Sequence, residues 1–96
     1  MLVLVTYDVN TESATGRKRL RKVCDVCEDY GLRVQNSVFE CVIEPALFVS
    51  VKKKLVELID LEKDSLRFYY LGNNWQGKVE HFGAKSIPDI QGTLIA

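Results

Sequence analysis

One carboxylate and a group of cations lie close together near the start of the chain. Asp8 follows an apolar run at a point where a strand should end, because Asp is depleted in strands and favoured in turns. Five of the six residues from 17 to 22 are cationic, namely Arg17, Lys18, Arg19, Arg21 and Lys22. Mg²⁺ takes oxygen ligands and often uses only one or two carboxylates. Together these residues suggest a site for a metal ion and a phosphate group.

Each half of this hypothesis has an alternative. One Asp per chain offers few ligands for a metal ion, and a two-fold dimer that brings two copies of Asp8 together would give a site with two carboxylates. Asp8 could instead only cap the loop that follows. Cations in the first half of a helix oppose the helix dipole, which indicates a use for the charge, whereas many charge runs form only a solvated face.

Other residues with chemical potential give weaker signals. Cys24 and Cys27 form a Cys-x-x-Cys pair, but zinc needs a second ligand pair, and Cys41 and His81 do not have the spacing to supply it. Core packing is favoured for the cysteines. His81 is the only histidine, and either a general-base role or a structural role is possible for it. Three aromatic residues could stack nucleobases or pack in the core or an interface: Tyr69, Tyr70 and Trp75.

The elements that would position these residues form one domain, residues 1–96. Period-two and period-3.6 apolar patterns predict strands over 2–8, 33–43, 66–71, 78–82 and 93–95, and helices over 14–30 and from Glu44-Pro45 onward. Ser13 or Thr15 could cap the first helix, and Gly31 is placed to end it. The long stretch 33–43 is polar in its middle, where we expect it to bend or meet a polar site.

This order of elements fits an α+β fold, the ferredoxin-like βαββαβ sandwich with an extra C-terminal strand. The fit requires residues 33–43 to supply one long strand or a broken strand pair. Both helices would cover one face of the sheet, and the other face, with its apolar side chains, would be a dimer surface. Residues 93–95 lack a partner strand within so small a domain, so we expect the segment 83–96 to pair with the sheet of a second subunit.

Composition limits the classes of function. The net charge is zero, with 13 basic and 13 acidic residues, which alone argues against a nonspecific nucleic-acid binder, but the clustering of charge can hide a basic face. The odd count of three cysteines and the absence of a secretory signal predict reduced thiols in the cytoplasm. No stretch approaches the roughly 20 apolar residues of a membrane helix, so no membrane partner is expected.

Several motifs taken together resemble the family of the small CRISPR-associated protein two, the partner of the CRISPR adaptation integrase. They are the strand ending in Tyr7-Asp8, the basic helix Arg19-Leu20-Arg21-Lys22-Val23, the run Val34-Gln35-Asn36-Ser37-Val38-Phe39-Glu40, and the closing segment from Asp89 to Ile95. The resemblance implies a ferredoxin-like homodimer whose final strand pairs with the partner's sheet. It also implies that Asp8 of each subunit approaches a shared divalent metal, and that Tyr7, Arg33 and Phe39 matter for nuclease activity, with a hydroxyl from Ser37.

The expected function is a metal-dependent endonuclease that hydrolyses phosphodiester bonds, with double-stranded DNA favoured, during spacer acquisition. Mg²⁺ or Mn²⁺ at the Asp8 pair would polarise a phosphoryl oxygen and lower the pKa of a bound water. The backbone phosphates would be bound by Arg33 and by the helix cations Arg17, Lys18, Arg19, Arg21 and Lys22. Two alternatives stay open: a non-catalytic dimeric adaptor that bridges integrase dimers on DNA, and an endoribonuclease acting on single-stranded RNA.

Overall fold

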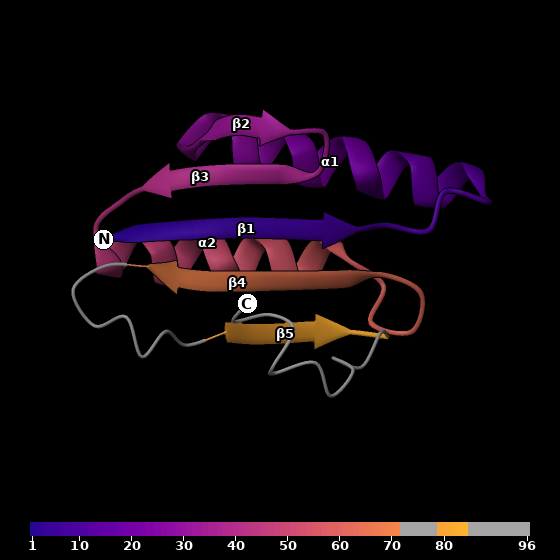
Figure 1. Cartoon of the computed structure of the whole chain (residues 1–96). Coiled ribbons are helices and arrows are strands. Elements are labelled where there is room, and N and C mark those ends of the chain that lie inside the picture. The colour runs from indigo at the N-terminus through magenta and orange to yellow at the C-terminus, as the bar shows by residue number, and fades with distance from the viewer. Residues whose placement is uncertain (72–78, 85–96) are drawn as a thin grey trace, which may run out of the picture.

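The computed structural model describes residues 1–71 and 79–84, which form an antiparallel five-stranded sheet with two helices behind one face (Figure 1). The elements are β1 (Leu2–Asp8), α1 (Ala14–Tyr30), β2 (Leu32–Gln35), β3 (Val38–Val42), α2 (Pro45–Leu58), β4 (Ser65–Leu71) and β5 (Val79–Gly83). The strand order is β2-β3-β1-β4-β5. This confirms the ferredoxin-like βαββαβ sandwich, with β5 added at the edge beside β4.

The central strand β1 separates the two sides of the sheet. Its side chains alternate strictly, so that Val3, Val5 and Tyr7 are buried towards the helices. The core lies between the sheet and the helices and contains the fully buried rings of Phe39, Phe48 and Phe68. We call the opposite side the open sheet face; it carries Leu2, Leu4, Thr6 and Asp8 from β1 and their neighbours from β3, β4 and β5.

Helix α1 begins and ends where its sequence predicts. Ser13 is the N-cap, and its side chain accepts a hydrogen bond from the backbone N–H of Gly16 at 3.1 Å. Gly31 ends the helix in an extended conformation, so its role is steric. A Cβ atom on Gly31 would lie 2.6 Å from the sulfur of Cys41, which shows that β3 passes too close for a larger residue.

Of the two forms expected for residues 33–43, the single long strand is wrong and the broken strand pair is confirmed, because the structure forms a hairpin there. β2 and β3 pair in antiparallel fashion around a turn at Asn36 and Ser37, with an irregular register between Arg33 and Gln35. The polar residues in the middle of this stretch favour a turn over a continued strand. The hairpin has a functional consequence, since it places Arg33 directly opposite Phe39.

The second half of the chain follows the expected order. Pro45 stands in the first turn of α2, as its sequence predicts. The strands expected over 66–71 and 78–82 correspond to β4 and β5. The segment 93–95 and Trp75 lie outside the described residues. Neither α1 nor α2 is long and apolar enough to span a membrane, within the part of the chain that the structure describes.

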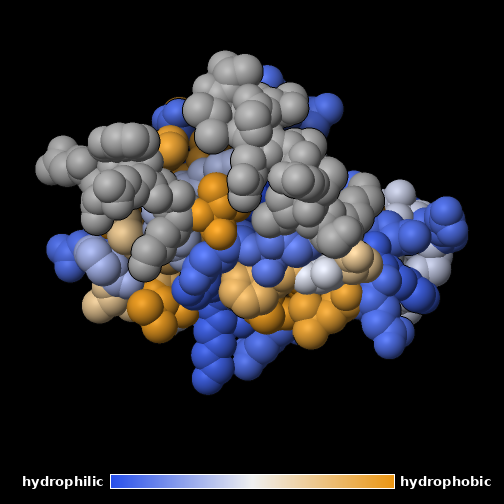
Figure 2. Space-filling model, turned by 60° about the horizontal axis from the view of Figure 1, so that its bottom comes forward, coloured by the Kyte–Doolittle hydropathy of each residue, from blue (hydrophilic) through white to orange (hydrophobic). Residues whose placement is uncertain are grey.

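Apolar side chains also reach the surface. Figure 2 brings the β5 edge forward and shows hydrophobic patches between hydrophilic residues on that side of the molecule. On the open sheet face Val42 is 80% exposed and Leu71 is 46% exposed. These side chains lie on the face that the sequence predicts as a dimer surface.

Candidate functional site

Asp8 lies at the rim of the open sheet face. It is the last residue of β1, it is exposed, and it faces away from the helices because Tyr7 before it is buried towards them. Asp8 borders a shallow cavity of about 210 Å³, together with Thr6, Ser65, Arg67 and His81. The structure therefore places the only histidine of the chain at the same cavity as the candidate metal ligand.

The surroundings of His81 keep its ring neutral. Burial and then the positive charge of Arg67 lower the pKa of His81 below its ordinary value, so the imidazole is uncharged near pH 7. Both ring nitrogens are buried and have no hydrogen-bond partner in the part of the chain that the structure describes. A neutral imidazole can accept a proton or bind a metal. The sequence alone did not decide the role of His81, because it does not contain the β4–β5 register that sets Arg67 opposite His81.

The oxygen donors at this cavity fit a hard cation only in part. Each chain supplies one carboxylate, from Asp8, and the hydroxyls of Thr6 and Ser65. Residues 1–71 and 79–84 contain no group of three His, Cys, Asp or Glu side chains arranged to hold a metal. Mg²⁺ keeps several waters and often uses one or two carboxylates. The donor set fits such an ion when a second copy of the chain adds its own Asp8.

A larger cleft lies on the helix side of the sheet, and we call it the arginine cleft. Its volume is about 570 Å³. One wall is α1, with Arg17 and Arg21, and the other is the β2–β3 hairpin, with Arg33 and Ser37. Tyr7 lies between the walls. The structure thus brings together five of the residues that the sequence predicts for the site, and it does so without Asp8.

A stacked group of side chains supports one wall of the arginine cleft. The rings of Tyr7 and Phe39 are stacked with centroids 6.1 Å apart, and the guanidinium carbon of Arg33 lies 5.3 Å from the centroid of Phe39. Arg33 also donates to the sulfur of Cys24. Burial, followed by the hydrogen bond to Cys24, raises the pKa of Tyr7, so its phenol stays protonated. The protonated phenol of Tyr7 is therefore no base near neutral pH, and the fully buried ring of Phe39, stacked on Tyr7, supports the guanidinium of Arg33.

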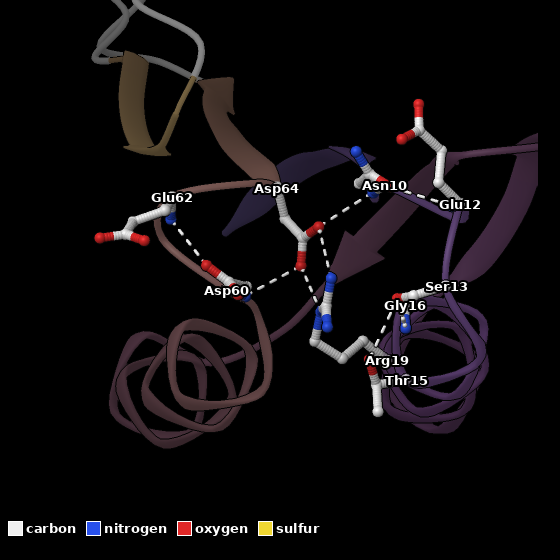
Figure 3. A network of polar contacts seen from close by, with 9 residues as sticks. All are labelled: Asn10, Glu12, Ser13, Thr15, Gly16, Arg19, Asp60, Glu62 and Asp64. Atoms are coloured by element: carbon white, nitrogen blue, oxygen red, sulfur yellow. Dashed lines mark hydrogen bonds and ion pairs between the residues drawn. The ribbon is translucent and has the colours of Figure 1, made fainter.

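The cations of α1 point in three directions, because the helical period of 3.6 separates them. Arg17 and Arg21 face the arginine cleft, while Lys18 and Lys22 are exposed. Arg19 is turned inward and forms an ion pair with Asp64, with 2.7 Å between its Nε and Oδ2 and 3.2 Å between its Nη2 and Oδ1 (Figure 3). Its guanidinium therefore has a partner inside the fold, which the sequence did not indicate.

Asp64 joins three segments of the chain. Its side chain is fully buried and accepts hydrogen bonds from the backbone N–H groups of Asn10 at 2.9 Å and Asp60 at 2.8 Å, besides those from Arg19 (Figure 3). Burial alone raises the pKa of Asp64, but the bonds from Arg19, Asp60 and Asn10 outweigh it and hold the pKa below its ordinary value. The carboxylate thereby fixes the loop that follows Asp8.

Asp8 and the basic residues are close in the sequence, but they do not border the same cavity in the folded chain. Asp8 borders the cavity on the open sheet face, whereas Arg17, Arg21 and Arg33 surround the arginine cleft on the helix side. Tyr7 borders both cavities. The structure therefore places the candidate metal ligand and the candidate phosphate ligands at two neighbouring cavities on opposite faces of β1.

Comparison with known proteins gives consistent results. The family model of the CRISPR associated protein Cas2 matches residues 1–79. The chain is 60% identical over 95 residues to the CRISPR-associated endoribonuclease Cas2 of Chlorobaculum tepidum, and 59% identical over 95 residues to the CRISPR-associated endonuclease Cas2 of Halalkalibacterium halodurans; each match covers 99% of both chains. The crystal structure of Streptococcus pyogenes Cas2 at pH 6.5 is 64% identical, with a TM-score of 0.70, over 79% of this chain and 92% of that one.

Proposed function

The chain belongs to the Cas2 family of CRISPR-associated proteins, and from this we propose that it is a divalent-metal-dependent endonuclease, active as a homodimer. The proposed reaction is hydrolysis of phosphodiester bonds, with double-stranded DNA as the favoured substrate, during spacer acquisition. The names of its relatives as an endonuclease and an endoribonuclease support the reaction class.

The position of Asp8 is the observation that carries this proposal. Its exposed carboxylate ends the central strand on the sheet face that neither helix of residues 1–71 and 79–84 covers. The same face exposes apolar side chains, including Val42 and Leu71. A two-fold dimer through this face would bury them and bring two copies of Asp8 near the axis. The dimer is thus part of the proposed active site.

The chemistry follows from the donor groups. A Mg²⁺ or Mn²⁺ ion held by the two Asp8 carboxylates would polarise a phosphoryl oxygen and lower the pKa of a bound water. His81, neutral at the same cavity, is placed to accept a proton. Arg67 adds a positive charge at the cavity, and Arg17, Arg21 and Arg33 bind backbone phosphates farther along the strand. Binding should weaken with salt, because phosphate contacts release counterions.

Two observations favour other functions. A relative with 60% identity is named an endoribonuclease, which favours single-stranded RNA as the alternative substrate. One carboxylate per chain is a sparse active site, which favours an adaptor that binds the CRISPR adaptation integrase on DNA in the cytoplasm. Comparing duplex DNA with single-stranded RNA at equal metal and salt separates the two substrates. Spacer acquisition with an inactive variant separates catalyst from adaptor.

The decisive variant is Asp8→Asn, with Glu12→Gln as its matched control. Both remove one exposed carboxylate, but Glu12 lies in the loop after β1 and borders neither cavity. Asp8→Asn should lower metal-dependent cleavage at least about a hundredfold, as does the loss of one charge-stabilising group in other enzymes. Glu12→Gln should keep full activity. Metal-dependent cleavage by highly purified Asp8→Asn protein would refute the assignment.

A further inference from the structure

The arginine cleft has the dimensions and lining of a small-molecule site. A cation that only touches the outer backbone of a duplex needs no concave surface around it. This cleft, at about 570 Å³, lies within the range of about 300–1,000 Å³ that is typical of ligand pockets. It also lies on the opposite face of the sheet from Asp8. Its occupant is therefore a part of the substrate other than the scissile phosphate.

The charges of the cleft select an anion. Among the residues that the structure describes, three guanidinium groups, those of Arg17, Arg21 and Arg33, border it, against one carboxylate, that of Asp25. Arg33 lies 4.0 Å from Glu28, but both side chains are about half exposed, so this ion pair is weak. One nitrogen of Arg33 donates to the sulfur of Cys24, and a guanidinium group has further N–H donors for a phosphate. Guanidinium groups bind phosphate in a bidentate manner. A phosphate group thus has ligands on both walls of the cleft.

The rest of the lining suits a nucleobase. Leu20 and Cys24 are half-buried and provide an apolar surface on α1, on either side of Arg21 in the sequence. Asn36 and Ser37, at the hairpin turn, provide amide and hydroxyl groups at the other side. Unstacked bases are bound by this combination of apolar or guanidinium surface and polar groups that meet the base edge.

We propose that the arginine cleft binds one unpaired nucleotide of the nucleic acid, with its phosphate on Arg17, Arg21 and Arg33 and its base against Leu20 and Cys24. A base within a duplex is stacked and paired and cannot enter the cleft. The inference rests on the proposed function, because it assumes a nucleic-acid substrate, and it restricts that substrate to one with a single-stranded segment or an unpaired end.

Cys24 provides a local probe for this site. It is the one cysteine that borders the cleft, whereas Cys27 and Cys41 are 1% and 2% exposed and serve as internal controls. The full chain is treated with iodoacetamide in EDTA, and labelling of each cysteine is followed by mass spectrometry. Without metal no cleavage occurs, so failure of this test is distinct from failure of the Asp8 assignment.

The expected result is that adenosine 5′-monophosphate slows labelling of Cys24, while inorganic phosphate at equal ionic strength does not. Single-stranded DNA and RNA of one sequence identify the source of the nucleotide, and a blunt duplex, which can bring only backbone phosphates to the arginines, should protect less than either. Arg21→Gln should weaken protection about tenfold, as expected for one charge-assisted hydrogen bond. Lys53→Gln removes an exposed cation of α2 that does not border the cleft and should have no effect.

Calorimetry with the same nucleotide and variants measures the affinities directly, so the test does not depend on the reactivity of Cys24. Equal protection of Cys24 by inorganic phosphate would show that the cleft binds anions without recognising a base, and it would overturn the proposal. Equal protection by the blunt duplex, or no nucleotide binding by either method, would overturn it as well.

Discussion

The guanidinium of Arg19 and the carboxylate of Asp64 form a two-pronged ion pair across 45 residues of sequence, with the carboxylate fully buried. The pair ties α1 to the residue that precedes β4, and through Asn10 to the loop after β1. Ser65, the next residue, stands opposite Asp8 in the sheet register. The end of the strand that carries the candidate metal ligand is therefore fixed from inside the molecule.

Removal of this carboxylate should destabilise the fold. Asp64→Ala leaves the charge of Arg19 and two backbone N–H groups without their acceptor. The free energy of unfolding should fall by about 3 kcal/mol. This is the lower end of the range for a broken buried ion pair, because the side chain of Arg19 keeps some contact with water. Urea unfolding measures this change. Glu62→Ala, an exposed position in the same loop, should stay within about 0.5 kcal/mol of the parent protein.

The same carboxylate should make stability depend on pH. The pKa of Asp64 is lower in the folded state than in the unfolded chain, so the unfolded state binds the proton more readily. The contribution is fully present above the unfolded pKa of about 3.9 and is lost as the pH falls through the folded pKa. Urea midpoints from pH 6 down to about pH 2 should fall less steeply in Asp64→Asn than in the parent. Equal slopes would show that other carboxylates dominate.

An acid on the open sheet face should prevent dimer formation. Val42→Asp introduces a charge at a side chain that is 80% exposed in the single chain, so the subunit should lose less than about 1 kcal/mol of stability. The proposed dimer should dissociate, and the proposed metal-dependent cleavage should fall with it. Val49→Asp places the same change on an exposed position of α2 and should leave both properties intact. Light scattering gives the oligomeric state, and an unchanged dimer in Val42→Asp would place the interface elsewhere.

The end of β5 should tolerate no side chain at Gly83. Its φ of 118° lies in the region that favours glycine, and a Cβ atom there would lie 2.0 Å from the backbone oxygen of Asp64. Gly83→Ala should therefore cost more than about 1 kcal/mol in the free energy of unfolding. Hydrogen exchange should show the loss in β4 and β5 first. Ser50→Ala, on the exposed surface of α2, gives the baseline for an added alanine.

The parts of the fold that the sequence predicted well are those with local signals. The alternation in β1 and the Ser13 cap of α1 depend on neighbouring residues alone. Whether residues 33–43 form one strand or a strand pair could not be decided from the sequence, because β2 is exposed along its whole length and no apolar period separates it from β3. A turn of two polar residues without glycine gives little further signal.

The candidate site was predictable in its members but not in its grouping. Alternation along β1 already sets Asp8 and Tyr7 on opposite faces, and the helical period already separates Arg19 from Arg17 and Arg21. The partner of Arg19 and the approach of His81 to the Asp8 cavity depend on contacts between residues distant in sequence. Such contacts follow from the register of whole strands, and no local pattern in the sequence contains them.

The alternation of β1 also determines which inherited changes the chain can accept. Loss or gain of one codon between Leu2 and Tyr7 would exchange the two faces, turning the carboxylate into the core and the phenol out to water. Replacement of a single side chain there would alter one site and leave the other intact. We expect natural lineages to vary the residue types of this strand while keeping its length constant, and to collect insertions in the loop after Asp8 instead.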